Sequence, residues 1–296
     1  MSVSGTSIFC RMLEKGRQAI VYEMKFKSET PNAMILPIPT RSGATEEDVQ
    51  FADFSGYEIF FDHLRRGFPH PTPPIGALSR QPSSAIDSLA IQKFGSFIAS
   101  VVPTVDDFDR LDPQFRIAKE TWLQIPAYVD YSFVVFQMEQ LSGKPHPMAF
   151  EFATGLTDQI FFPTVHIHDG QLHDREHFDH QLFAQSNVLD EIAGAYRTPK
   201  HIDTTTGWTR SNRTAGDFMS MDKTLGLVAP NQLVHRKLMR GMLANTDTFA
   251  SLDKFTYSAA SSSQFWIVGG IAALAAAPMA WIIRRRMQMS QRDSAT

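Results

Sequence analysis

Short apolar runs bounded by turn residues recur along the first half of the chain. The runs 19–27 and 33–39 predict two strands that pair with each other antiparallel, and Pro37 and Pro39 place the second strand at an edge or end it. Turn residues separate successive runs by about 8 to 15 residues, a spacing typical of antiparallel β domains. Further strands are predicted where Phe, Val and Ile concentrate, at 94–102, 130–138, 145–153 and 159–165.

Helical spacing of apolar residues is confined to a few segments. It predicts a short helix over 57–66 and a helical turn over 189–196, whereas 232–244 fits either a helix or a strand. Residues 204–217, rich in Ser, Thr, Asn and Gly, predict a loop. We therefore predict a β-rich α+β body over residues 1–250, built on an antiparallel, sandwich-like sheet with a few helices.

Two segments of biased composition lie within this body and at its end. Residues 69–84 hold five prolines and no periodic pattern, which predicts an extended connection. Residues 251–264 are rich in serine and predict a flexible stalk. This stalk would join the body to the C-terminal segment of the chain.

The C-terminal segment contains the most apolar stretch of the chain, residues 265–283, FWIVGGIAALAAAPMAWII. As a helix it would be roughly 28 Å long, close to the ~30 Å hydrocarbon thickness of a bilayer. Trp266 and Trp281 lie near its two ends, where indole rings favour the headgroup level, and the basic tail 284–296 begins with three arginines. The pattern predicts a single transmembrane helix at 265–283 that anchors the chain in a lipid bilayer.

The orientation of this span is indicated by two opposing features. Residues 1–20 contain no apolar stretch long enough for a secretory signal, which favours a cytoplasmic body. The arginines at 284–286 favour the opposite orientation, because positive flanks prefer the cytoplasmic side. We give the missing signal more weight and predict a single-pass, tail-anchored membrane protein with a cytoplasmic body. A signal upstream of Met1 would make the body extracytoplasmic.

Splitting the net charge by position supports this division. The 296 residues include 28 Lys and Arg against 31 Asp and Glu, a net charge of −3. Residues 265–296 hold four of the arginines and one aspartate, so the rest of the chain carries 24 basic and 30 acidic side chains. An acidic body without a clustered basic face argues against a nucleic-acid partner. The single cysteine, Cys10, cannot form an internal disulfide.

Histidines form the one concentration of chemically versatile side chains. Asp169-Gly170 lies between alternating residues and predicts a two-residue hairpin turn. In that hairpin His166 would face His173, and His168 would share their side of the sheet. Six of the ten histidines fall within 36 residues: His166, His168, His173, His177, His180 and His201.

Three imidazoles on one face have several interpretations. His166, His168 and His173 could bind zinc or another divalent metal and leave one position open for water, which would support hydrolysis. The same face could instead be the solvated side of a two-sided strand, or the clustered imidazoles could respond to pH. Residues 173–177 also match the H-x-x-E-H pattern of the inverted zincin peptidases, but that family needs a glutamate ligand farther along, and the last glutamate here is Glu191.

Motifs for nucleotide binding and for serine hydrolases are absent from the sequence. We therefore expect a binding protein more than an enzyme: a membrane-anchored β-rich body that presents an interaction surface. Its candidate partners are a small ligand, another protein or a second copy of the chain. The alternative is a membrane-tethered, metal-dependent hydrolase that uses the histidines between 166 and 180.

Overall fold

The computed structural model describes residues 2–68, 92–94, 96–195 and 206–254. The chain divides into two units, residues 1–252 and 253–296. The predicted connection at 69–84, the span at 265–283, the tail at 284–296 and most of the stalk at 251–264 lie outside the described residues. Among the residues that are described, no helix is long and apolar enough to cross a membrane.

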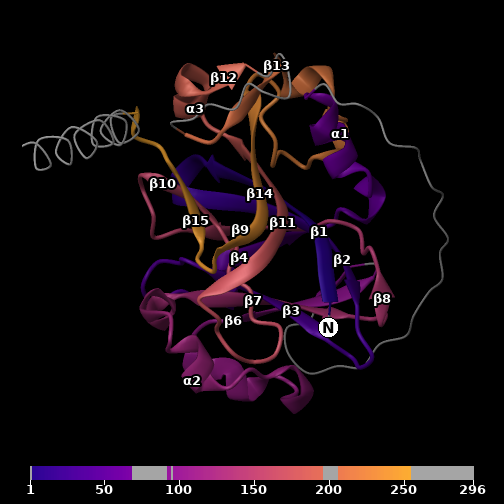
Figure 1. Ribbon diagram of the computed structural model, residues 1–296, viewed down its shortest axis with the longest axis vertical. Coiled ribbons are helices and arrows are strands. Elements are labelled where there is room, and N and C mark those ends of the chain that lie inside the picture. Colours follow the sequence, from indigo (N-terminus) through magenta and orange to yellow (C-terminus); the bar gives the residue numbers. More distant parts are fainter. Residues whose placement is uncertain (1, 69–91, 95, 196–205, 255–296) are drawn as a thin grey trace, which may run out of the picture. The chain divides into compact units, whose positions relative to one another are not determined.

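The first unit is built around a large mixed sheet (Figure 1). Its strand order is β12-β13-β14-β11-β1-β2-β9-β4, and β8 pairs with β2 beside this path. In chain order the strands are β1 (Ser2–Leu13), β2 (Arg17–Lys27), β4 (Val49–Ala52), β8 (Ser142–Gly143), β9 (Met148–Ala153), β11 (Arg175–Gln185), β12 (Gly194–Ala195), β13 (Thr209–Thr214) and β14 (Leu233–Ala244).

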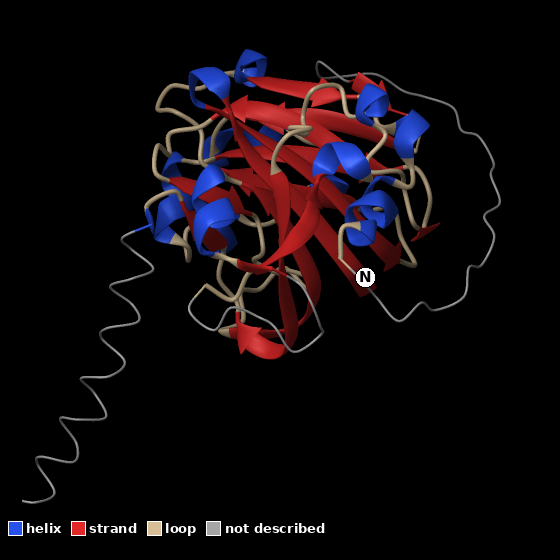
Figure 2. Cartoon of the chain, turned by 90° about the horizontal axis from the view of Figure 1, so that it is seen from above, coloured by secondary structure: helices blue, strands red, loops and turns tan. Residues whose placement is uncertain are grey.

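Two smaller sheets and three α-helices accompany the large sheet. One small sheet has the order β3-β7-β6-β5, and the other pairs β10 with β15. The short helices lie along the sides of the strands (Figure 2). These elements are β3 (Ala33–Ile38), β5 (Gln92–Phe94), β6 (Phe97–Val102), β7 (Ser132–Met138), β10 (Gln159–Phe162), β15 (Thr248–Ser251), α1 (Phe60–Arg66), α2 (Lys119–Trp122) and α3 (Asn187–Ile192).

The β-rich α+β class is confirmed, but the sheet is mixed where an antiparallel one was predicted. β1 runs parallel to β11, with Ser7 opposite Gln181, and β12 runs parallel to β13. The predicted pairing of β2 with β3 is also wrong. Both edges of β2 are taken, by β1 on one side and by β9 and β8 on the other, so β3 pairs with β7 instead.

Several strands were not predicted from the sequence, and in β1, β11 and β13 the reason is a weak apolar signal. β1 begins with SVSGTS, β11 begins with REHFDHQ, and β13 is the polar hexapeptide TRSNRT in the middle of a predicted loop. In β11 the period of two is nevertheless present, because Phe178, His180 and Leu182 are buried while His177 and Asp179 are exposed. A histidine at an inward position conceals the pattern.

Aromatic side chains fill two apolar cores in the described part of the chain. The first packs α1 onto β1 and β2, with Phe60 in edge-to-face contact with both Phe9 and Tyr57. The second lies beside β6 and β7, where Trp122 stacks on Phe108 at 5.3 Å between ring centroids. Val165 and Ile167, from the loop that precedes β11, pack against this second core.

Candidate functional site

The segment 163–174 connects β10 to β11 and carries three of the clustered histidines. It forms no regular strand, so the hairpin predicted at Asp169-Gly170 is wrong. Asp169 instead accepts a hydrogen bond from the backbone of Gln171, and its other oxygen lies 3.0 Å from Nε2 of His173. A local side-chain hydrogen bond of this kind competes with strand pairing, which explains why Asp169-Gly170 does not form the predicted hairpin turn.

Side chains from the turn after β14 hold the first half of this loop. Asn245 accepts from the amide of His166 at 2.8 Å and donates to the carbonyl oxygens of His166 and His173. Asp247 accepts from the amides of Thr164 and Val165 at 2.9 and 3.2 Å. These bonds replace the missing strand ladder, and they fix the backbone that carries His166.

Asp247 is a partly buried carboxylate with an additional partner. Its second oxygen accepts from the hydroxyl of Tyr128 at 2.6 Å. Burial raises the pKa of Asp247 to about 6, although the hydrogen bonds from Tyr128 and from the two backbone amides act in the opposite direction. The same burial, with the nearby carboxylate, raises the pKa of Tyr128 far above its usual range, so Tyr128 stays a hydrogen-bond donor.

The principal contact of His166 is with His180 of β11, a residue outside the predicted metal set. Their Nε2 atoms are 3.0 Å apart, and the ring of His166 stacks on Phe178. Desolvation lowers the pKa of His166 to about 4 and that of His180 to about 3. Positive charge on His168 would also oppose protonation of His166, and charge on His166 or His168 would oppose protonation of His180. At neutral pH both rings are therefore uncharged, and one Nε2 donates to the other.

The structure brings His166 and His168 together but gives His173 a different contact. The rings of His166 and His168 are 5.0 Å apart between centroids, whereas His173 is half-exposed and paired with Asp169. Within the described ranges, no group of three or more His, Cys, Asp or Glu side chains has the arrangement of a metal site. Metal binding by His166, His168 and His173 stays a prediction.

The H-x-x-E-H pattern at 173–177 requires one helical turn, and the structure contradicts it. Residues 175–177 begin strand β11, so His173 and His177 do not share a helix face. Cys10, the single cysteine, lies within β1 and is fully buried. Burial raises the pKa of its thiol well above the usual value, which removes its nucleophilic character.

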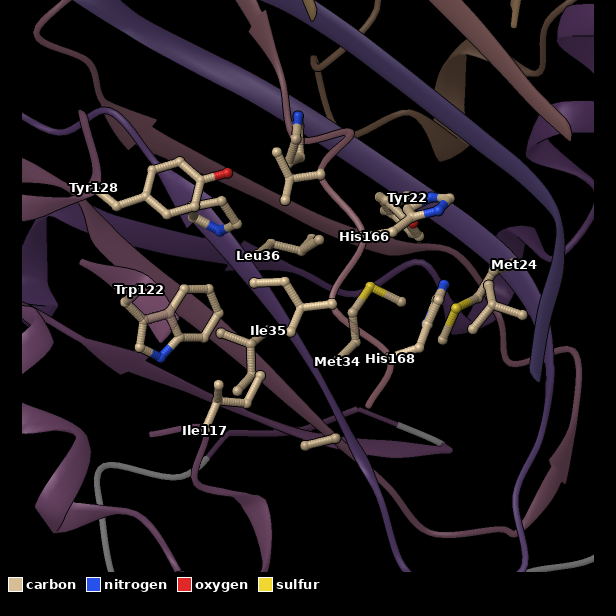
Figure 3. Close-up of a pocket in the computed structure, with 16 residues that line it drawn as sticks. Tyr22, Met24, Met34, Ile35, Leu36, Ile117, Trp122, Tyr128, His166 and His168 are labelled. Carbon is tan, nitrogen blue, oxygen red and sulfur yellow. The ribbon is translucent and has the colours of Figure 1, made fainter. Parts of the chain in front are cut away.

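A cavity of about 90 Å³ opens where the loop 163–168 faces β3. Met24, Met34 and His168 gather on one side of it, while Trp122 and Ile117 lie on the other (Figure 3). The lining residues are apolar or uncharged: Val3, Tyr22, Met24, Ala33, Met34, Ile35, Leu36, Pro37, Ile117, Trp122, Tyr128, Pro163, Val165, His166, Ile167 and His168. This pocket, with the His166–His180 pair at its margin, is the candidate functional site.

Sequence reasoning identified two residues of this pocket, His166 and His168, and missed the rest. His180 could have been recognised as inward-facing from its alternation with Phe178 and Leu182. The contributions of β3 and α2 had no such signal, because they depend on which elements meet across the fold.

Comparison with known proteins adds no family. No protein-family model matches the sequence, and no curated protein is similar to it. Among solved structures, baculovirus P35 is 13% identical, covers 84% of this chain and 96% of its own, and gives a TM-score of 0.42. A mutated baculovirus P35 after caspase cleavage is 13% identical, with 85% and 98% covered and a TM-score of 0.41. P35 in its complex with caspase-8 is 11% identical, covers 84% of this chain and 97% of its own, and gives a TM-score of 0.39. Likeness at the level of these three structures defines no shared fold or activity.

Proposed function

We propose that the chain is a membrane-anchored binding protein whose β-rich body takes up a small ligand in the pocket beside the loop 163–168. The observation that carries this proposal is the pocket itself, an uncharged cavity of about 90 Å³. The loop that forms one wall is fixed by Asn245 and Asp247. A wall that is already ordered costs little further entropy on binding, so the pocket suits recognition.

The contacts of the histidines favour binding over catalysis. The Nε2 atom of His166 is engaged by His180, and the Nε2 atom of His173 is engaged by Asp169. A nitrogen held by a partner within the fold is not available as a general base, and among the nitrogens of His166 only Nδ1 has no partner in the residues that the structure describes. The partnered nitrogens of these two histidines therefore act as structural contacts.

The anchor in this proposal is the apolar segment 265–283, which rests on the sequence alone. It would hold the body at a bilayer surface, with residues 1–264 on the cytoplasmic side. An apolar pocket close to a bilayer would have access to ligands that partition into lipid.

The binding function is tested by closing the pocket. We expect Val165→Phe to abolish binding of small organic fragments, because it adds an aromatic ring to the lining. The matched variant Val129→Phe should leave binding unchanged, since Val129 is 54% exposed and lies outside the lining. Carbon-13 labels on the methionine methyl groups report occupancy through Met24 and Met34. The proposal fails if no fragment shifts these two signals, or if both variants bind equally.

A further inference from the structure

We propose that the ligand of this pocket is a slender, uncharged molecule with a hydroxyl group, of the class of the aliphatic alcohols. This inference rests on the binding function proposed above and names the chemistry that the pocket recognises. It derives from the charge of the lining, from its size and from its buried nitrogen atoms without a partner in the described chain, which are Nδ1 of His166 and Nε1 of Trp122.

The lining contains no charged side chain. None of its sixteen residues is Asp, Glu, Lys or Arg. A carboxylate or ammonium group that entered would lose its hydration shell without gaining an opposite charge, at a cost of several kcal/mol. The pocket therefore selects against ionised ligands, although a charged group of the same length would fit.

The size of the cavity favours a chain over a ring. Its volume of about 90 Å³ is smaller than the ~150 Å³ of an engineered apolar cavity that takes up benzene. Met24 and Met34, which lie on the same side of the pocket in Figure 3, are unbranched side chains that adjust to irregular shapes. A chain one methylene wide needs the least displacement of these walls.

The hydroxyl group is indicated by His166. Its Nδ1 atom is buried and has no hydrogen-bond partner among the described residues, while its Nε2 atom is occupied by His180. If Nε2 of His166 donates to His180, Nδ1 of His166 has no proton and is an acceptor. If Nε2 of His166 accepts from His180, Nδ1 of His166 carries the proton and is a donor. A hydroxyl group satisfies either state, because it both donates and accepts, and it removes the cost of an unpaired buried nitrogen.

The experiment compares four probes of equal chain length on the full-length protein labelled at its methionine methyl groups. They are 1-propanol, 1-chloropropane, propanoate and propylammonium, whose chains are smaller than benzene, titrated at pH 7 against their measured free concentrations. We expect 1-propanol to shift Met24 and Met34 saturably and to bind at least tenfold more tightly than either ion. The inference is overturned if an ion binds as tightly as the alcohol.

A cycle of protein and probe variants isolates the hydrogen bond. In His166→Phe, we expect the affinity for 1-propanol relative to 1-chloropropane to fall about fivefold, the value of one ordinary hydrogen bond. Comparing this affinity ratio between wild type and variant cancels the greater apolarity of the chloroalkane. An affinity ratio that is the same in both proteins contradicts the role of His166. Where His166→Phe does not fold, His166→Leu serves instead, with the same expected loss, because leucine has no hydrogen-bonding group. If no probe shifts Met24 or Met34, the binding function itself fails, which separates that outcome from an error in the ligand class.

Discussion

At the scale of single residues, the site consists of polar groups that are buried and paired with one another. His166 pairs with His180, and Tyr128 pairs with Asp247. Residue types alone could identify the histidines as candidates, but they could not show which nitrogen meets which. That choice depends on a loop whose backbone is fixed by Asn245, about eighty residues away along the chain.

The histidine pair predicts a loss of stability in acid. Because the pKa values of His166 and His180 fall below their usual 6.5 in the folded state, the unfolded chain binds more protons between pH 6.5 and about 4. The free energy of unfolding should therefore decrease as the pH falls through this window, by up to about 1.4 kcal/mol per pH unit for each histidine. Urea unfolding at several pH values between 7 and 4 measures the slope.

Two variants test whether the histidine pair causes this pH dependence of stability, and Asp247 contributes a pH dependence of opposite sign. His180→Leu should flatten the slope, while His177→Leu, at an exposed position of the same strand, should leave it unchanged. Asp247 acts in the opposite direction, because its raised pKa of about 6 makes the folded state bind more protons than the unfolded chain between pH 3.8 and 6. Equal slopes in wild type and His180→Leu would contradict the pairing.

At the scale of elements, two buried glutamines join parts of the fold that are not neighbours in the sheets. The side-chain amide of Gln18 on β2 donates to the carbonyl of Phe161 at 2.7 Å and accepts from its amide at 3.0 Å. Gln185, at the end of β11, makes the same pair of bonds with Ala229 at 2.8 and 2.8 Å. Each side chain thus acts as one residue of an additional strand.

Removing the Gln18 bridge should be costly. In Gln18→Leu the amide and carbonyl of Phe161 are left buried without partners, and we expect the free energy of unfolding to fall by about 2–4 kcal/mol. The exposed Gln50 of β4 provides the control, because Gln50→Leu removes the same group where water can replace it. A comparison of the two variants by denaturant unfolding decides the point, and a loss of similar size in both would show that the bridge is unimportant.

The sequence predicted elements better than it predicted their pairing. The elements recognised close to their observed bounds are β2, β3, β7, β9 and α1. Most of these strands are nearly continuous apolar runs, and α1 has apolar residues at helical spacing. Strand partners have no comparable local signal. The parallel contact of β1 with β11 joins two strands with polar beginnings, and only the folded chain reveals that both are central.

At the scale of the whole molecule, the proposed function combines a pocket in the first unit with an anchor in the second. The two parts rest on different observations, the lining of the cavity and the apolar sequence 265–283. They can therefore be tested separately, and either can fail alone.

The proposed anchor predicts that removing the C-terminal segment releases the protein from membranes. A chain that ends after Gln264 should move from the membrane pellet to the supernatant, because the only apolar stretch of spanning length has been removed. Replacing 284–286 with three glutamines provides the control, since it removes charge but keeps the span. A truncated chain that still sediments with membranes would contradict the anchor.

The place of β1 at the centre of the large sheet also bears on how the protein is synthesised. Gly5 donates its amide to Asp179, a partner 174 residues farther along the chain. During translation the β1–β2 pair can form early. The other edge of β1 stays unpaired until its partner β11 has left the ribosome. An open strand edge invites pairing with other nascent chains, and contacts so distant in sequence slow folding. The first strand to be made is thus among the last to be enclosed, and chaperone demand should be greatest during that interval.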